Sequence, residues 1–197
     1  MKVLAATTNR GKIQEISDIL ARVGVSIVSM AELGIVLDVI EDGETFEENA
    51  VKKAVAFREA SGMHALADDS GLCVDALSGA PGVYSARYAG PQAQDQDNIA
   101  LLLKHLTGVE DRSARFVCVA ALALRDGRVI TARGEFPGLI IDTPRGLGGF
   151  GYDPIFLDPV TGKTFAELTL EEKNRMSHRR RALEELQEKL TVLSVKF

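Results

Sequence analysis

The chain has 197 residues, of which 46% are hydrophobic and 26% charged, and its formal net charge is −5. This composition is ordinary for a water-soluble globular protein, and the length suits one large domain or two closely packed lobes. The negative charge argues against broad electrostatic binding to nucleic acid or to an anionic membrane. A phosphate-bearing ligand therefore requires a local cluster of cations.

Two cysteines and the apolar runs bear on where the protein works. Cys73 and Cys118 stand alone in apolar stretches without metal-ligand spacing, which predicts buried thiols in a reducing compartment. The apolar run at the start is too short for a signal peptide, and no stretch approaches membrane-spanning length. We therefore expect a cytoplasmic protein.

The N-terminal segment predicts a strand over residues 2–7, a helix and a second strand over residues 25–28. Apolar residues recur at three- and four-residue spacing from Ile13 to Val23, and Gly24 ends the pattern. This opening is typical of α/β proteins. The first strand-to-helix loop can hold a phosphate through backbone donors, small polar side chains and one cation, although an ordinary Asn-capped helix is the simpler explanation. The loop residues are Thr7, Thr8, Asn9, Arg10, Gly11 and Lys12.

A polar connection over residues 31–44 leads into another predicted helix. It ends in Glu41-Asp42-Gly43-Glu44, where the carboxylate of Glu41 can reach a ligand or remain a loop charge. Thr45 and Glu48 form a capping-box pattern at the start of the helix. Its expected inner face consists of Phe46, Ala50, Ala54 and Phe57.

An acidic pair, Asp68-Asp69, follows a short strand predicted at residues 64–67, and Ser70 and Gly71 precede a strand-like stretch over residues 72–77. Two carboxylates at a strand end are difficult to bury unless cations share the space. Oxygen ligands of this kind suit Mg²⁺ together with substrate phosphates. For these four residues alone, a solvated acidic turn is the simpler alternative.

The second half of the chain predicts a helix over residues 97–106 and an antiparallel meander over residues 115–124, 128–135 and 139–141. The meander makes the sheet mixed. Short helices are expected at residues 164–168 and 171–176. A final helix follows Ser177, with Ala182, Leu183, Leu186 and Leu190 inward.

Two further segments carry side chains suited to a ligand. The glycine-dense turn over residues 146–154 contains Phe150, which could stack on a nucleobase, although glycine clusters also simply make turns. His178 and Arg179 precede the final helix and could equally be a cap and a solvated face.

Six ordered motifs give the chain a specific resemblance. They are Thr7-x-Asn9-x-x-Lys12, Thr45-Phe46-x-Glu48-Asn49-Ala50, Ala67-Asp68-Asp69-Ser70-Gly71-Leu72, Pro81-Gly82-Val83-Tyr84-Ser85-Ala86-Arg87-Tyr88, Gly148-Gly149-Phe150-Gly151-Tyr152-Asp153-Pro154 and Ser177-His178-Arg179. From residue 2 to about residue 190, the chain resembles the inosine triphosphate pyrophosphatase (Ham1/RdgB) family.

The resemblance implies a single domain over residues 1–197 with an α/β fold. A mixed central β-sheet flanked by helices would form two closely packed lobes with a substrate cleft between them. The implied activity is Mg²⁺-dependent hydrolysis of ITP, dITP and XTP to the monophosphate and pyrophosphate by a homodimer, with no nucleic-acid or membrane partner.

The resemblance also implies roles for individual residues. Asp69 would be the catalytic base and a metal ligand, Glu41 the second metal ligand, and Ser70 a substrate contact. The loop from Thr7 to Lys12 would hold the triphosphate. The base and phosphate pocket would be lined by Phe150, Gly151, Tyr152, Asp153, Lys173, His178 and Arg179.

The chain departs from the family pattern at two positions. Members often carry Glu-Glu-Thr-Gly where this chain has Ile40-Glu41-Asp42-Gly43, so Glu41 or Asp42 must serve in place of a glutamate at position 40. Arg180 stands where glycine is frequent. Three alternatives stay open: a pyrophosphatase for other modified triphosphates, a nucleotide-binding sensor without catalysis and, more distantly, a nucleic-acid-binding module.

Overall fold

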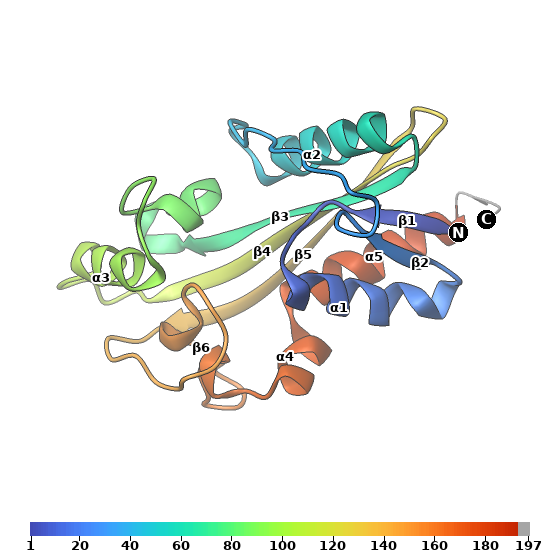
Figure 1. Ribbon diagram of the computed structural model, residues 1–197. Helices are drawn as coiled ribbons and strands as arrows, with labels where there is room; N and C mark the ends of the chain where they lie inside the picture. The colour runs from blue at the N-terminus through green and yellow to red at the C-terminus, as the bar shows by residue number, and fades with distance from the viewer. Residues whose placement is uncertain (193–197) are drawn as a thin grey trace. The chain divides into compact units, whose positions relative to one another are not determined.

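The structure is a computed structural model that describes residues 1–192, and of Arg10 and Gly11 it describes the backbone alone. Figure 1 shows strands and helices alternating along the first half of the chain. The elements are β1 (Lys2–Ala5), α1 (Arg10–Leu20), β2 (Ser26–Ser29), α2 (Phe46–Ser61), β3 (His64–Val74), α3 (Asp95–His105), β4 (Ser113–Ala123), β5 (Val129–Ile140), β6 (Phe156–Leu157), α4 (Leu170–Met176) and α5 (His178–Val192).

The strands form one mixed sheet in the order β2-β1-β3-β4-β5-β6. β1 pairs in parallel with β2 and with β3, and Leu4 lies opposite Val28 on one side and Ala65 on the other. β6 pairs antiparallel with the end of β5. The predicted α/β class with a mixed, helix-flanked sheet is therefore confirmed.

The chain divides into two compact units. The first comprises residues 1–69, 118–134 and the chain from His178 onward, and the second comprises residues 70–117 and 135–177. Each of β3, β4 and β5 contributes one end to each unit. The single domain over residues 1–197 and the cleft between two lobes stay predictions.

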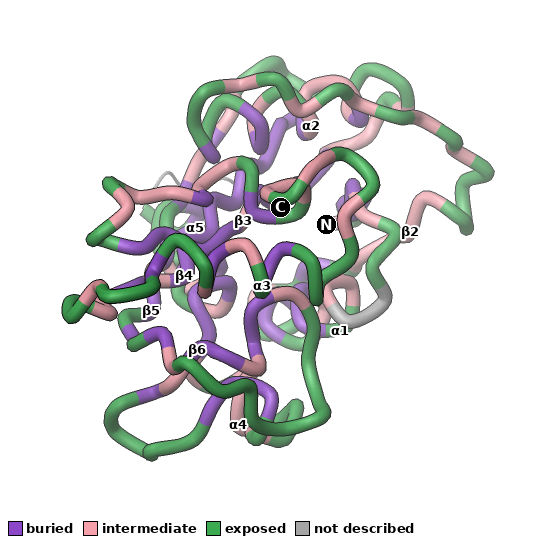
Figure 2. Tube along the Cα trace, turned by 90° about the vertical axis from the view of Figure 1, so that its left-hand side faces the viewer, coloured by how far each residue is buried: buried purple, intermediate pink, exposed green. Residues whose placement is uncertain are grey.

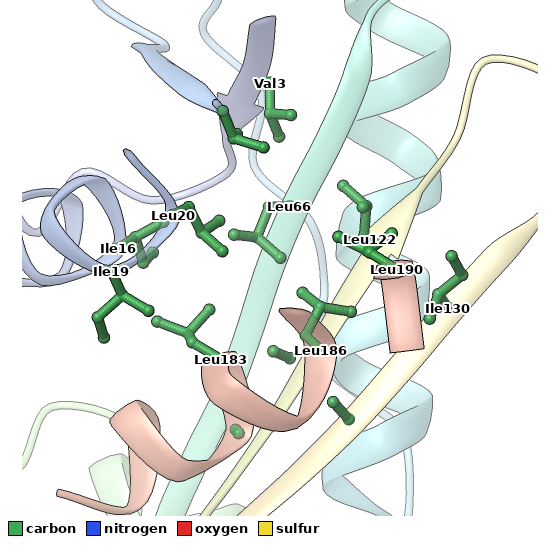
Figure 3. Packing of buried hydrophobic residues seen from close by; sticks show 14 of the residues in the cluster. Val3, Ile16, Ile19, Leu20, Leu66, Leu122, Ile130, Leu183, Leu186 and Leu190 are labelled. Carbon is green, nitrogen blue, oxygen red and sulfur yellow. The ribbon is translucent and has the colours of Figure 1, made fainter. Parts of the chain in front are cut away.

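Helices cover both faces of the sheet in the first unit, with α2 on one face and α1 and α5 on the other (Figure 1). Apolar side chains of α1, α5 and the strands point toward one another in Figure 3. The helical members come from the inward stripes that the sequence predicts for the two helices, because residues three and four apart share one face. The labelled members are Val3, Ile16, Ile19, Leu20, Leu66, Leu122, Ile130, Leu183, Leu186 and Leu190.

The second unit has its own apolar core, built around aromatic rings. Phe116 and Phe156 have ring centroids 4.4 Å apart, and Phe156 meets Phe165 edge to face at 4.9 Å. Such tilted and edge-on contacts avoid the less favourable face-to-face stacking of aromatic rings. Figure 2 shows buried residues following β3 and β4, whose burial patterns are almost continuous.

Local signals place the helix ends where the sequence predicts them. The side chain of Asn9 accepts a hydrogen bond from the backbone N–H of Lys12 at the start of α1. Thr45 and Glu48 form the capping box of α2. Gly24 and Gly62 adopt the left-handed conformation that ends a helix and that glycine tolerates best.

Two strand predictions are wrong. β3 does not stop before the acidic pair but continues through Asp68 and Asp69 to Val74, and both carboxylates are buried. Cations compensate one of these charges, so the strand can remain extended and buried where sequence alone favours a turn. The strand predicted at residues 139–141 is also not separate, because β5 runs unbroken through Pro137.

Two further properties follow from the described residues. Cys73 and Cys118 are buried free thiols, as predicted. Over residues 1–192, no helix has both the length and the apolar character needed to cross a bilayer.

Candidate active site

Asp68 is the centre of the charged cluster in the first unit. Its Oδ2 atom accepts hydrogen bonds from Lys12 Nζ at 2.9 Å and from Arg179 Nε at 3.2 Å. Burial opposes ionisation of Asp68, but the charges of Lys12 and Arg179 outweigh it and hold the pKa of the carboxyl well below its usual range. The first turn of α1, the first turn of α5 and the middle of β3 therefore meet at one ionised carboxylate.

Arg179 has a second buried partner on α1. Its Nη1 atom donates to Glu15 Oε2 at 2.9 Å, and both side chains are only 6% exposed. Burial opposes the charge of Arg179 too, yet Asp68, with Cys118 and Glu15 contributing less, keeps the pKa of the guanidinium above its usual value. Asp68 was predicted only as part of an acidic pair suited to Mg²⁺, and no role was predicted for Glu15, although Glu15 follows Lys12 by one helical turn.

Asp69 points toward a different helix from its neighbour. Its Oδ2 atom accepts a hydrogen bond from Asn49 Nδ2 of α2 at 3.0 Å. The other end of the same side chain, Asn49 Oδ1, accepts from the backbone N–H of Gly43 at 2.8 Å. The buried Asn49 side chain thus connects the predicted catalytic carboxylate with the turn that carries Glu41.

Glu41 is attached to the same region through Lys53. The Nζ atom of Lys53 lies 2.7 Å from Glu41 Oε1 and donates to the carbonyl oxygen of Asp68 at 2.9 Å. By contrast, Asp42 is exposed and pairs with Lys52 at the surface. Of the two acidic residues that could serve beside Ile40, Glu41 is therefore the one directed toward β3.

The donor set of this region suits a hard divalent cation that also uses ligand oxygens from a substrate. Asp69 and Glu41 supply two carboxylates, and proteins commonly hold Mg²⁺ through one or two carboxylates plus phosphates and water. Over residues 1–192, no group of three or more His, Cys, Asp or Glu side chains is arranged to hold a metal ion by itself.

The predicted phosphate loop lies between β1 and α1. Thr7 Oγ1 accepts from the backbone N–H of Asn9 at 3.2 Å, and Thr8 and Asn9 are exposed. Arg10 and Gly11 are both predicted substrate contacts; the structure describes only their backbone, so the Arg10 side chain lies outside the described residues. The side chain of Lys12 is 20% exposed, and its ammonium group lies beside Asp68.

His178 and Arg179 are positioned by a close approach between α5 and β5. Both residues are buried at the start of α5, contrary to a solvated face. A Cβ atom at Gly134 of β5 would overlap the carbonyl oxygen of His178 and the backbone nitrogen of Ala182. The missing side chain at Gly134 therefore lets the helix start close enough to the sheet for Arg179 to reach Asp68.

The second unit contains the glycine-aromatic turn. Asp153 Oδ2 accepts from the backbone N–H of Phe150 at 2.9 Å and forms an ion pair with Lys173. Lys173 Nζ lies 4.8 Å from the centroid of the Phe150 ring. Phe150 remains 54% exposed. A Cβ at Gly149 would overlap Asp153 Oδ2, so the turn needs glycine there. The arrangement leaves Phe150 partly exposed, with the ammonium group of Lys173 over its ring.

The remaining predicted contacts in the second unit have different environments. Tyr152 is buried, and its hydroxyl donates to the carbonyl oxygen of Ser85 at 2.9 Å. The backbone N–H of Gly151 donates to Asp95 at 2.7 Å. Ser70 is half-buried in β3. The structure thus commits the Tyr152 side chain to internal packing, and the ligand roles of these residues stay predictions.

The predicted site residues fall into one set in each unit. In the first unit, Lys12 and Arg179 meet at Asp68, next to the predicted base Asp69, and Lys53 ties Glu41 to the same strand. In the second unit, Asp153 joins Phe150 and Lys173. Sequence reasoning missed Glu15, Asn49 and Lys53. Spacing held a signal for all three, because Glu15 follows Lys12 by three residues in α1, and Asn49 and Lys53 lie four residues apart on one face of α2.

Comparisons with known proteins point to one family. The profile of the Ham1 family matches residues 3–189. A dITP/XTP pyrophosphatase of Desulforamulus reducens is 50% identical to this chain, and the alignment covers 99% of this chain and 98% of that protein. A dITP/XTP pyrophosphatase of Bacillus subtilis is 48% identical over 94% of both chains. The structure of the Staphylococcus aureus Ham1 protein matches with a TM-score of 0.88 at 43% identity, covering 97% of this chain and 98% of that one.

Proposed function

Since this chain belongs to the Ham1 family, we propose that it is a pyrophosphohydrolase of non-canonical purine nucleoside triphosphates. It converts dITP, XTP and ITP to the monophosphate and pyrophosphate, which removes these nucleotides from the cellular pool. The single observation that carries the proposal is the meeting of Lys12 and Arg179 at the buried Asp68, directly beside Asp69. Of these two cations, Lys12 has a partly exposed side chain, which supports binding of a triphosphate by a protein whose net charge is negative.

The triphosphate is assigned to the N-terminus of α1. Thr7, Thr8 and Asn9 offer small polar groups, and the backbone of Arg10 and Gly11 opens the helix, where free N–H groups and the helix dipole attract phosphate. Lys12 adds a partly exposed ammonium group, which also balances Asp68. Substrate phosphate would compete with Asp68 for this ammonium group, while Arg179 would still balance Asp68.

Mg²⁺ is the proposed cofactor, held by Asp69 and Glu41 together with substrate oxygens. When bound, it supplies charge neutralisation and polarises the phosphoryl group. Lys53, which pairs with Glu41 in the structure, keeps that carboxylate near β3. Glu41 is proposed as the ligand rather than Asp42, because Asp42 is exposed and paired at the surface.

Asp69 is the proposed catalytic base. It accepts a proton from a water molecule whose oxygen attacks the α-phosphorus, and the bond to the bridging oxygen breaks to release pyrophosphate. The nucleoside monophosphate takes the oxygen of the water. Chemistry of this type depends mainly on positioning and electrostatics, and no covalent intermediate is required.

Binding of the substrate's nucleobase is assigned to the second unit, where the partly exposed ring of Phe150 can stack on a purine. Lys173 and Asp153 hold that ring and its turn in place, and Ser70, Gly151 and Tyr152 are retained as proposed contacts. Selectivity for a 6-oxo group is assigned to donors at His178 and Arg179 or to backbone N–H groups, because a 6-amino group would leave such donors unpaired.

The family resemblance further supports a cytoplasmic homodimer with no nucleic-acid or membrane partner. Both cysteines are free thiols, which suits a reducing compartment.

The test is a pyrophosphate-release assay over a nucleotide panel with and without Mg²⁺. We expect kcat/KM for dITP, XTP and ITP to exceed that for dATP and dTTP by several orders of magnitude, with no turnover in EDTA. Equal values for dTTP and ITP would contradict the assignment to purines. Binding of dITP without pyrophosphate release would favour a sensor.

A further inference from the structure

Asn49 occupies a buried position between two parts of the first unit. Its side chain donates from Nδ2 to Asp69 Oδ2 at 3.0 Å and accepts at Oδ1 from the backbone N–H of Gly43 at 2.8 Å. The residue is only 1% exposed, so water does not compete for these groups. A single carboxamide therefore connects a carboxylate of β3 with the turn before α2.

The chemistry of the two partners defines the orientation of the amide. Gly43 presents a donor and Asp69 presents an ionisable acceptor, so the oxygen must face the former and the NH₂ group the latter. The reversed amide would place two donors together at Gly43 and two acceptors together at Asp69. Neither an aliphatic side chain nor a carboxylate at position 49 can make both bonds.

A second side chain on the same face of α2 makes a parallel connection. Lys53, one turn after Asn49, joins Glu41 Oε1 and the carbonyl oxygen of Asp68 at 2.7 and 2.9 Å. The Glu41–Gly43 turn is thus attached to β3 at two consecutive residues. Gly43 packs tightly against the Asn49 side chain, because a Cβ at position 43 would lie 2.7 Å from Asn49 Oδ1.

We propose that Asn49 is a positioning residue that holds the Asp69 carboxylate and the Glu41–Gly43 turn in one fixed arrangement. The inference rests on the proposed function, since it assigns to Asn49 the placement of both carboxylates that would contact Mg²⁺. Outer partners that orient metal-binding carboxylates typically contribute about 10- to 100-fold in metal affinity or activity. Asn49 itself touches neither the metal nor the substrate.

The test combines two variants with two readouts. Asn49→Leu removes both hydrogen bonds and replaces the side chain by one of similar volume. Gly43→Ala keeps Asn49 but adds a Cβ that would push its carboxamide out of place. The first readout is the Mg²⁺ dissociation constant of the nucleotide-free protein, measured by titration calorimetry. The second is hydrogen exchange of the Gly43 amide in wild type and Asn49→Leu, followed by NMR.

The chain offers a matched control in Asn98 of α3. Its side chain is also buried, accepts from the backbone N–H of Ala89 at 2.8 Å and donates to the carbonyl oxygen of Ala86 at 3.3 Å. The substitution Asn98→Leu also removes one accepted and one donated hydrogen bond of a buried carboxamide, but neither of them involves a carboxylate. It reports what losing a buried asparagine does to the protein in general.

We expect Asn49→Leu and Gly43→Ala each to weaken Mg²⁺ binding by about 10- to 100-fold. Exchange at the Gly43 amide should accelerate in Asn49→Leu. Turnover of dITP at saturating nucleotide should fall while KM changes little, and Asn98→Leu should match wild type in Mg²⁺ affinity. Mg²⁺ affinity within twofold of wild type for both Asn49→Leu and Gly43→Ala would overturn the proposal. Should wild type release no pyrophosphate at all, the proposed function would be wrong, but calorimetry and amide exchange would still decide the role of Asn49.

Discussion

Arg179 donates a hydrogen bond to Asp68 across 111 residues of sequence, and both side chains are almost completely buried. A buried charge pair is tolerated when its remaining hydrogen-bonding groups are also matched. Here Lys12 contributes a second cation to Asp68, and Glu15 a second carboxylate to Arg179. The first turns of two helices are thereby fixed to the middle of one strand.

Removing Arg179 should destabilise the protein more than removing Lys12. Arg179→Met leaves two buried carboxylates, Asp68 and Glu15, without their shared cation, so we expect a loss of about 3–5 kcal/mol in the free energy of unfolding. Lys12→Met leaves Asp68 paired with Arg179, and Lys12 is itself partly exposed, so its effect should be smaller. Urea unfolding of both variants gives the order. Equal losses would show that the buried network does not stabilise the first unit as described.

The low pKa of Asp68 predicts how stability depends on pH. Its folded-state pKa is lowered, so the unfolded chain binds the proton more readily. The stabilisation is complete above the ordinary aspartate pKa of about 4 and is lost as pH falls below it toward the folded-state value. Urea midpoints between about pH 3 and pH 6 should therefore decline toward acid less steeply in Asp68→Asn than in wild type. Parallel curves for the two proteins would show that the pKa of Asp68 is not lowered in the folded state.

Asp69→Asn should remove activity while leaving the fold intact. The amide oxygen can still accept from Asn49, so thermal unfolding should change little. It cannot take a proton from water, and loss of a general base lowers kcat by about 10²- to 10⁴-fold. Pyrophosphate release from dITP is the measurement. Release at the wild-type rate would exclude Asp69 as the base.

Phe150→Ala should weaken substrate binding with little effect on stability. The ring is largely exposed, so its truncation removes few packing contacts, whereas stacking on a base contributes about 1–3 kcal/mol. KM for dITP should rise about 5- to 150-fold at nearly constant kcat. Leu147→Ala is the matched control, because Leu147 is fully exposed in the same turn and has no assigned contact. The same KM for both variants would remove Phe150 from the base site.

Sequence alone determined the features that depend on near neighbours. The caps at Asn9 and Thr45 and the inward faces of the helices follow from spacings of three and four residues, and the structure has them where the pattern places them. The motifs likewise identified the family, because their order and spacing are properties of the chain itself.

Only the tertiary structure decided which charges meet. Sequence could not show that Asp68 would receive both Lys12 and Arg179, or that Asn49 would hold Asp69, because these contacts join segments between 20 and 111 residues apart. It also led us to end β3 too early, since local propensity treats two adjacent aspartates as a turn. Burial of the Asp68 carboxylate is tolerated because distant helices bring cations to it, and that condition depends on packing rather than on spacing.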